Sequence, residues 1–173
     1  MIAVVGPSGV GKDSVMAGLR AEKGGIGLVR RVITRAPDPD GENHISLSVD
    51  EFEHTKTAGD YILDWQAHGL NYAIPKASLG PLMQGGDMLI NLSRNVLLDA
   101  NSVFENFVVV NLTASPDVLR ARLQARGRET KEDIEKRIAR AVDPLPAALT
   151  THMINNDHSI EITIKTIIDC LDL

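Results

Sequence analysis

The stretch MIAVVGPSGVGKDS, residues 1–14, decides the fold of this chain. It joins a short apolar run, Ile2–Val5, to the pattern Gly-x-x-x-x-Gly-Lys, which spans Gly6–Lys12. A continuous apolar run that stops at glycine predicts a strand buried on both faces. The segment that follows, KDSVMAGLRAE, has helical spacing. Strand, glycine loop and helix in this order form the context in which a phosphate-binding loop, or P-loop, functions.

The residues of the loop predict how it would hold a nucleotide. Gly9 and Gly11 allow backbone angles and a close approach that a β-carbon would forbid. Backbone N–H groups would surround the phosphates, and Lys12 would bridge the β- and γ-phosphates. We therefore expect the whole stretch to bind a nucleoside triphosphate, through Gly6, Pro7, Ser8, Gly9, Val10, Gly11, Lys12, Asp13 and Ser14.

The residue after the loop lysine departs from the usual pattern. Ser or Thr normally stands there and holds Mg²⁺ through its hydroxyl, whereas this chain has Asp13, with a hydroxyl one residue later at Ser14. Asp13 could hold Mg²⁺ through its hard oxygens, or it could favour the helix dipole and leave other work to Ser14. A carboxylate beside a triphosphate repels it unless a divalent cation lies between them. The aspartate therefore implies a metal ion, held by Asp13, by Ser14 or by both.

Length and composition indicate one globular domain over residues 1–173. Hydrophobic residues make up 43% of the chain and charged residues 24%, and the net charge is −5. An acidic chain argues against a dedicated nucleic-acid-binding protein. No apolar run approaches the length of a membrane span or a signal peptide, so we expect a cytoplasmic protein that binds small molecules but neither nucleic acid nor membrane. The oligomeric state stays open, with a homodimer as one option.

Strands and helices alternate along the chain. DMLINL (87–92) and FVVVNL (107–112) are apolar runs of the type found in buried parallel strands. SPDVLRARLQARG (115–127) begins with an N-cap serine and a proline at the first helical position, and KEDIEKRIARAVD (131–143) predicts a further helix. HMIN and SIEITIKTIIDCLDL (159–173) predict a last strand and a closing helix. The order predicts an α/β fold of the P-loop NTPase type, in which helices cover both faces of a mainly parallel sheet.

A small subdomain is expected at about residues 34–75. GLVRRVITR (27–35) predicts one strand that leads into it, and YILDWQAHGLNYAI (61–74) predicts two strands joined by a tight turn. Aromatic residues make up only 3% of the chain, yet three of them fall together here: Tyr61, Trp65 and Tyr72. We interpret the segment as a subdomain with a ligand face, in which Trp65 is better explained as part of a hydrophobic core.

Several stretches in combination resemble the ribose 1,5-bisphosphate phosphokinases. They are GPSGVGKDS, RRVITR, GENHISLSVDEF, WQAHGLNY, NLSR, SPDVLRARLQARGRE, RIARA and NND, and they run from Val4 to about Asp157. These ATP-dependent enzymes of bacterial phosphonate breakdown make phosphoribosyl diphosphate and belong to the wider guanylate-kinase-like group. The resemblance implies a kinase that uses ATP and Mg²⁺ and phosphorylates ribose 1,5-bisphosphate.

Guanylate kinase shares this layout, so the acceptor pocket has to discriminate. Guanylate kinases usually carry Ser-x-Thr-Thr-Arg-x-Pro-Arg there; in this chain the serine is replaced by Arg31 and the second arginine by Asp38. Their tyrosine that holds the phosphate of GMP gives way to Glu42-Asn43-His44, and their guanine-reading glutamate aligns near Asp64. Because unpaired polar groups in a closed pocket cost about 1–3 kcal/mol each, GMP is the less favoured acceptor.

A third hypothesis comes from another class of protein. Some guanylate-kinase-like domains are non-catalytic binding modules, and these typically lose the phosphate loop. Gly6, Gly11 and Lys12 are all present here, which argues against such a module.

The resemblance also implies roles for residues outside the loop. Arg31, Arg35 and His44 would supply the positive charge that a sugar bisphosphate calls for. Asn155 and Asn156 align with the region that contacts adenine in the relatives, although isolated asparagines are more often turn residues. The acceptor site is thus expected to comprise Arg31, Arg35, His44, Tyr72, Ser93 and Arg94.

Cations are concentrated in one part of this acidic chain. Eight of its eighteen lysines and arginines fall between Arg120 and Arg140. A solvated helix face explains this spacing about as well as a ligand site does. Gly127 favours the second view, because it interrupts the helix and offers a hinge. We therefore expect a lid over about residues 122–132 that closes on the transferring group, with four catalytic arginines in and beyond it: Arg122, Arg126, Arg128 and Arg137.

Overall fold

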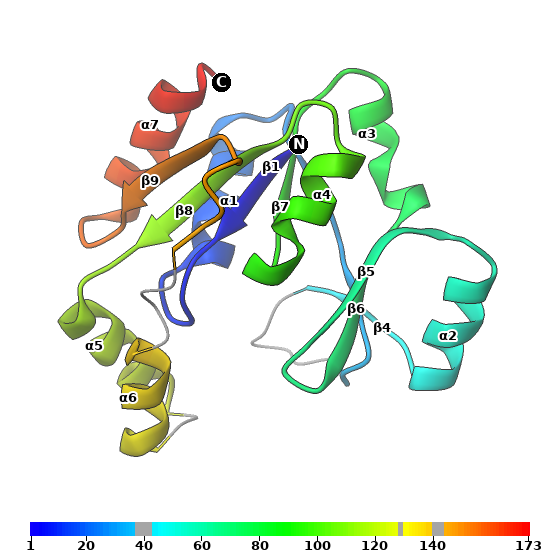
Figure 1. Cartoon of the computed structure of the whole chain (residues 1–173). Coiled ribbons are helices and arrows are strands. Elements are labelled where there is room, and N and C mark those ends of the chain that lie inside the picture. Colours follow the sequence, from blue (N-terminus) through cyan, green and yellow to red (C-terminus); the bar gives the residue numbers. More distant parts are fainter. Residues whose placement is uncertain (37–42, 128–129, 140–143) are drawn as a thin grey trace.

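The computed structural model of the chain describes residues 1–36, 43–127, 130–139 and 144–173 (Figure 1). Its main sheet has five strands, all of them parallel to their neighbours. In spatial order they are β2 (Gly27–Leu28), β7 (Met88–Asn91), β1 (Ile2–Val5), β8 (Val108–Thr113) and β9 (Thr151–Asn155). The predicted parallel α/β sheet is therefore confirmed.

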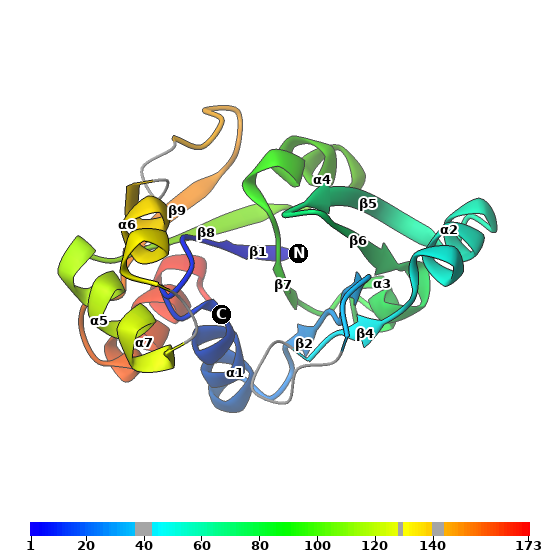
Figure 2. The same cartoon turned by 90° about the horizontal axis from the view of Figure 1, so that it is seen from below.

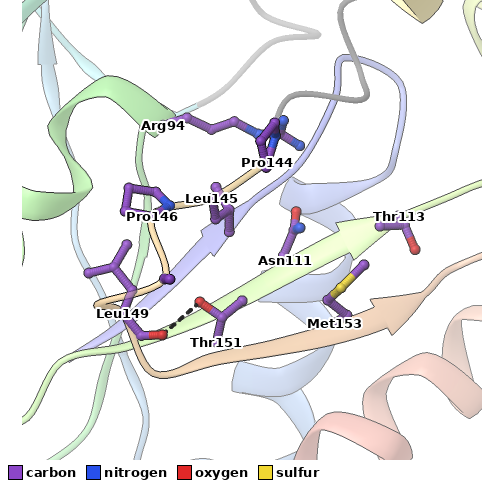
Figure 3. A pocket seen from close by; sticks show the side chains of 10 residues that line it. Arg94, Asn111, Thr113, Pro144, Leu145, Pro146, Leu149, Thr151 and Met153 are labelled. Atoms are coloured by element: carbon purple, nitrogen blue, oxygen red, sulfur yellow. Dashed lines mark hydrogen bonds between the residues drawn. The ribbon is translucent and has the colours of Figure 1, made fainter.

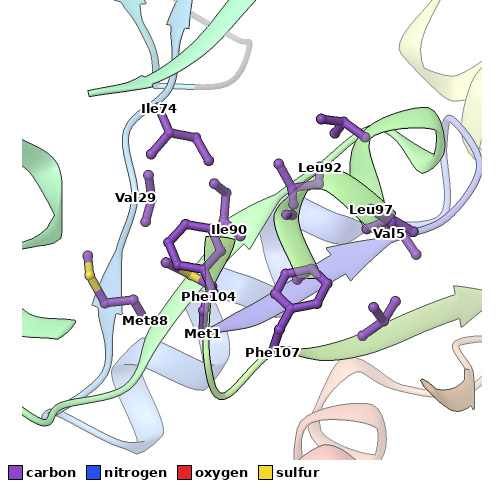
Figure 4. Packing of buried hydrophobic residues seen from close by; sticks show 14 of the residues in the cluster. Met1, Val5, Val29, Ile74, Met88, Ile90, Leu92, Leu97, Phe104 and Phe107 are labelled. Carbon is purple, nitrogen blue, oxygen red and sulfur yellow. The ribbon is translucent and has the colours of Figure 1, made fainter. Parts of the chain in front are cut away.

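The first strand lies in the middle of this sheet because its residues are apolar on both faces. All four side chains of β1 are buried, and alternate ones enter different hydrophobic clusters. Ile2 and Val4 pack with α1 (Lys12–Glu22) and α7 (Ile160–Leu171), whereas Ala3 and Val5 pack on the other face. Figure 4 shows this second cluster, in which Phe104, Phe107 and Leu97 gather around β1 and β7.

The helix signals in the sequence lie where they were expected. α5 (Pro116–Arg126) begins with Pro116 at its first position, and the side chain of Ser115 accepts a hydrogen bond from the Val118 N–H. α6 (Lys131–Ala139) follows it. η2 (Arg94–Val96) and α4 (Leu97–Val103) lie on the face of the main sheet that bears Ala3 and Val5. A further short helical segment consists of η1 (Lys76–Leu79) and α3 (Gly80–Met83).

A second, four-stranded sheet is built almost wholly from residues of the expected insert. Its spatial order is β4 (Ile45–Ser46), β3 (Val32–Ile33), β6 (Leu70–Pro75) and β5 (Tyr61–Ala67), with α2 (Val49–Thr57) following β4 in the chain. β5, β6 and β3 pair antiparallel, and β3 and β4 pair parallel. This sheet and the pair α5 and α6 lie on opposite sides of β1 (Figure 2). The assignment of residues 34–75 to acceptor binding stays a prediction.

The prediction of one strand over residues 27–35 is wrong. Those residues form β2 in the main sheet and β3 in the second sheet, with Arg30 and Arg31 between them. The two arginines interrupt the apolar run, and its two halves pair with different strands: β2 pairs with β7, and β3 pairs with β4 and β6. Among the described residues, no helix is long and apolar enough to cross a membrane.

Replacing Gly6 with alanine should destabilise the fold. The φ angle of Gly6 is +148°, and a Cβ placed there would lie 2.5 Å from the backbone oxygen of Leu112 in β8. We expect Gly6→Ala to lower the free energy of unfolding by about 2 kcal/mol or more, measured by urea denaturation. Gly24→Ala is the matched control, since a Cβ at Gly24 meets nothing within 4 Å. Equal midpoints for the two variants would contradict this reading of the loop.

Candidate functional site

The loop between β1 and α1 has the backbone shape that its glycines predict. Gly9 and Gly11 have φ angles of +85° and +95°, and Gly11 is the N-cap of α1. A Cβ on Gly9 would lie 3.0 Å from Leu123 of α5, and one on Gly11 would lie 3.0 Å from Nδ2 of Asn156. The loop is therefore packed between α5 and the segment that follows β9, where larger residues have no room.

The ammonium group of Lys12 lies over the loop itself. Its Nζ donates hydrogen bonds to the carbonyl oxygens of Gly6, at 2.9 Å, and Pro7, at 3.1 Å. These contacts hold the positive charge beside the N-terminus of α1, where the helix dipole also favours an anion. The loop and its lysine thus form one cationic site at the end of β1.

Asp13 and Ser14 occupy the first turn of α1, and both are exposed. The side chain of Asn91, which ends β7, reaches toward Asp13, with Asn91 Nδ2 3.5 Å from Asp13 Oδ1. Among the described residues, no group of three or more His, Cys, Asp or Glu side chains could hold a metal ion alone. Mg²⁺ is usually held by one or two protein oxygens together with substrate phosphates and water, so the carboxylate and hydroxyl here fit that mode of binding.

Two of the predicted arginines contact the loop. Arg122 of α5 donates from Nη1 to the carbonyl oxygen of Val10, at 3.3 Å, and from Nη2 to that of Asn156, at 2.8 Å. Arg137 of α6 donates from Nη1 to the hydroxyl oxygen of Ser8, at 3.0 Å. The structure therefore brings both side chains from beyond residue 120 to the P-loop.

A separate arginine joins α5 to α6, and the assignment of residues 122–132 as a lid stays a prediction. Arg120 of α5 donates to both carboxylate oxygens of Glu135 in α6, at 2.7 and 3.1 Å, and to Asp117 at 2.7 Å. This bidentate pair holds α6 against α5. Gly127, with φ +63°, is the C-cap of α5 in the left-handed conformation common at helix ends, and Arg126 is exposed beside it. Arg128 lies outside the described residues, as do Asp38, Glu42 and Arg140.

The two asparagines after β9 have different surroundings. Asn156 is buried; it donates from Nδ2 to the Val10 carbonyl at 2.7 Å and accepts from the Thr163 hydroxyl at 2.6 Å. Asn155 is exposed and donates to Asp157 at 3.2 Å. Asn156 thus supports the P-loop from beneath, and its expected contact with adenine stays a prediction.

Aromatic and cationic side chains meet where the second sheet faces the main one. Arg31 is only 5% exposed, and its guanidinium lies 5.3 Å from the ring centre of Tyr72 and 5.9 Å from that of Trp65. The two rings stack 5.4 Å apart, which gives a cation–π arrangement. Trp65 Nε1 donates to the hydroxyl of Ser93, at 3.0 Å. Trp65 is therefore a core residue, as predicted, that also joins the two sheets.

His44 and Arg35 lie together at the edge of the second sheet. The ring Nε2 of His44 is 3.2 Å from the carbonyl oxygen of Arg35, and the His44 ring is buried. Ser46 Oγ donates to the same carbonyl, at 2.5 Å. The Arg35 side chain is exposed. The structure thus fixes the backbone that carries Arg35.

The chain is similar to known proteins over most of its length. The family model described as an AAA domain matches residues 2–143. The chain is 46% identical over 166 residues to ribose 1,5-bisphosphate phosphokinase PhnN of Ruegeria sp. (strain TM1040), covering 95% of this chain and 87% of that one. It is 41% identical over 174 residues to the protein of that name in Agrobacterium fabrum, covering 99% and 95%. The chain belongs to the ribose 1,5-bisphosphate phosphokinase family.

A solved structure supports the fold of this phosphokinase family member independently. Guanylate kinase from Anaplasma phagocytophilum superposes with a TM-score of 0.73 over 99% of this chain and 84% of that one, at 20% identity. The guanylate-kinase-like P-loop architecture is confirmed, and so is the resemblance that the sequence motifs indicated.

A cavity next to Arg94 is lined by residues that the sequence analysis of this phosphokinase family member did not identify. It has a volume of about 470 Å³ and opens between the face of β8 and β9 and the segment before β9 (Figure 3). Arg94, Asn111, Thr113 and Thr151 line its polar side, and Leu145, Leu149 and Met153 contribute apolar walls. Asn111 was visible in the sequence as the one polar residue of the run FVVVNL. Arg94 thus lies in the wall of this cavity.

The carboxylate of Asp157 should make stability depend on pH. Hydrogen bonds from the Ser115 backbone N–H, at 2.7 Å, and from Asn155 hold the pKa of Asp157 below its ordinary value. Its contribution is therefore present above the unfolded pKa of about 3.9 and is lost as the pH falls through the lower folded value. We expect Asp157→Asn to lower the denaturation midpoint at pH 7, and the difference from the parent to shrink below about pH 3.9. Asp169→Asn, at an exposed position of α7, is the control. A difference between Asp157→Asn and the parent that stays constant with pH would refute the role of the Asp157 carboxylate.

Proposed function

We propose that the protein transfers the γ-phosphoryl group of ATP to the 1-phosphate of ribose 1,5-bisphosphate. An oxygen of that phosphate forms a bond to the γ-phosphorus while the bond from this phosphorus to the bridging oxygen breaks, which yields 5-phosphoribosyl 1-diphosphate and ADP. The observation that carries the proposal is the sequence identity of 46% and 41% to two ribose 1,5-bisphosphate phosphokinases over nearly the full length. By the family resemblance, this reaction would serve phosphonate breakdown.

The donor side follows from the loop. The backbone N–H groups of Gly9–Lys12 would bind the β- and γ-phosphates, and the Lys12 ammonium would exchange its carbonyl partners for phosphate oxygens. Asp13 and Ser14 would hold Mg²⁺, which supplies charge neutralisation between the phosphates and the Asp13 carboxylate. Asn91 stands 3.5 Å from Asp13 and would orient that carboxylate.

The reaction needs alignment rather than a general base. A phosphate oxygen is already anionic at neutral pH, so the enzyme's contribution is to bring two anions into line and offset their repulsion. Arg137, which contacts Ser8 in the loop, would move onto the transferring group. Arg122 and Arg126 on α5 would add positive charge on the same side, and Arg128 would follow them.

The acceptor would lie between the loop and the second sheet. Ser93 and Arg94 follow β7, whose neighbour in the main sheet is the strand that leads into the P-loop. Arg31 and Tyr72 lie on the facing side, joined to Ser93 through Trp65. These groups offer cations and hydroxyls to a compact ester with two phosphates, and Arg35 and His44 would extend the set.

One ion pair favours the sugar bisphosphate over GMP. Asp64 aligns near the glutamate that reads guanine in guanylate kinases. Here its carboxylate accepts a hydrogen bond from Lys56 of α2, at 2.5 Å, and this bond raises the pKa of Lys56. Side chains alternate along a strand, so Asp64 is on the opposite face of β5 from Trp65 and from the Arg31 cluster. The carboxylate is thus turned toward α2.

Phosphorus NMR distinguishes the two acceptors directly. The protein is incubated with ATP and Mg²⁺ and with either ribose 1,5-bisphosphate or GMP. We expect new diphosphate resonances on the sugar together with ADP, and little conversion of GMP, because the base would leave unpaired groups in the pocket. Conversion of GMP to GDP without any sugar product would assign the chain to the nucleoside monophosphate kinases. ATP binding with neither reaction would indicate a binding module.

Replacing Lys12 with methionine should abolish turnover while the fold is retained. The side chains are similar in length, but methionine cannot neutralise the β- and γ-phosphates. We expect kcat to fall by about a hundredfold or more, with an unchanged circular dichroism spectrum and denaturation midpoint. Lys165→Met, at an exposed position of α7, is the control for loss of a lysine. Activity within a factor of about two of the parent would place the donor site elsewhere.

A further inference from the structure

The carbonyl of Val10, at the tip of the phosphate loop, is held from outside the loop by two side chains. It accepts hydrogen bonds from Asn156 Nδ2, at 2.7 Å, and from Arg122 Nη1, at 3.3 Å. The Val10 side chain is fully buried in the cluster shared with α1 and α7, and the glycines on either side have positive φ angles. The peptide that joins Val10 to Gly11 therefore has one defined orientation.

This orientation decides where a backbone donor points. In a planar trans peptide the N–H of Gly11 is directed opposite to the carbonyl of Val10. The carbonyl is directed toward Asn156 and α5, so the Gly11 N–H is directed to the other side of the loop. Backbone donors on the concave side of such a loop are the groups that bind phosphate. Fixing the carbonyl thus aims an amide at the nucleotide.

Asn156 can do this only if its own amide is fixed. Turned by 180°, it would bring Oδ1 against the Val10 oxygen, and two acceptors would face each other. The Val10 carbonyl, which can only accept, sets this orientation, and Thr163 of α7 holds the amide in place, because its hydroxyl donates to Asn156 Oδ1 at 2.6 Å. The exposed fractions of Asn156 and Thr163 are 4% and 1%, so water has little access to replace the bond. The backbone N–H of Asn156 is also bonded, to the Thr113 oxygen at 2.8 Å.

We infer that Thr163 is a positioning residue for nucleotide binding, which acts through Asn156 on the Val10–Gly11 peptide of the phosphate loop. Thr163 itself touches neither the loop carbonyl nor the proposed phosphate position; its hydroxyl holds the Asn156 amide in the position from which Nδ2 reaches the Val10 carbonyl. The inference rests on the proposed nucleotide site and adds to it a determinant on a helix near the end of the chain.

A merely structural role for the same hydroxyl makes a different prediction. Thr163 Oγ1 also lies 3.5 Å from the Ser159 carbonyl, the usual partner one turn earlier in a helix. If that contact were what matters, its loss would lower stability and leave nucleotide affinity unchanged. If the relay matters, the loss would appear in the affinity for nucleotide and in the exchange of loop amides.

The experiment compares Thr163→Val, which removes the hydroxyl at nearly constant shape, with Thr163→Ser, which keeps it. Thr166→Val is the matched control, because Thr166 lies on the same helix and bonds only the Ile162 carbonyl, at 2.8 Å, among the contacts described for it. Calorimetry with ADP and Mg²⁺ should show Kd raised about tenfold in Thr163→Val and changed less than about twofold in Thr163→Ser and Thr166→Val. KM for ATP should rise in parallel, with KM for the acceptor unchanged.

Amide hydrogen exchange supplies a readout that needs no substrate. Amides of Gly9–Lys12 should exchange faster in Thr163→Val than in the parent, with β1 unchanged. Thr163→Ala removes the same hydroxyl and serves if the valine variant does not fold. Parent-like nucleotide affinity and loop exchange in the folded variant overturn the inference. A parent protein that binds no ADP would instead overturn the proposed function, so the two failures are distinct.

Discussion

The close packing of a glycine loop against three other parts of the chain is the constraint on which the rest of the structure depends. Gly6 adjoins the backbone of β8, Gly9 adjoins Leu123 of α5, and Gly11 adjoins Asn156 after β9. A Cβ at Gly6 would clash with that backbone, and one at Gly9 or Gly11 would be tight against a side chain and strained by the positive φ, so the loop is closely fitted to these elements. The parallel sheet provides this, because β1 and β8 are neighbours and the chain leaves both at the same edge. The loop that would bind phosphate therefore depends on the assembly of the sheet.

Polar contacts join the second sheet to the main sheet, in addition to the hydrophobic cluster that both sheets share. Trp65 packs with the main hydrophobic cluster while its indole N–H bonds Ser93, and Asn95 donates to the Gln66 carbonyl at 3.5 Å. These contacts connect the β5–β6 hairpin to the turn after β7. Ile33, Tyr72 and Ile74 of the second sheet also enter the hydrophobic cluster of the main sheet, so the polar contacts add to a shared core.

Local patterns in the sequence predicted the elements, and contacts between distant residues were beyond them. Ile2–Val5 and the glycine spacing after it identify strand and loop within fourteen residues, because burial and backbone freedom are properties of each residue. The spacing of Arg122 indicated a helix face but not its partner, the Val10 carbonyl, which lies 112 positions away. Thr163 resembles any β-branched residue of a closing helix, and only the folded chain shows its hydroxyl beneath the loop. The division of residues 27–35 between two sheets was missed for the same reason.

Two arginines of α5, Arg120 and Arg122, have different kinds of partner. Arg120 is bonded to Glu135 and Asp117, and this pairing raises its pKa, so its charge is offset within the protein. Arg122 donates instead to two neutral carbonyls, which orient the guanidinium and leave its charge uncompensated by those bonds. A guanidinium carries five N–H donors, and these two bonds use two of them. The same helix therefore supplies a structural ion pair at one position and, two residues later, a cation aimed at the loop. In this acidic chain the difference matters, because a carboxylate paired with Arg122 would offset the positive charge that Arg122 brings beside the loop.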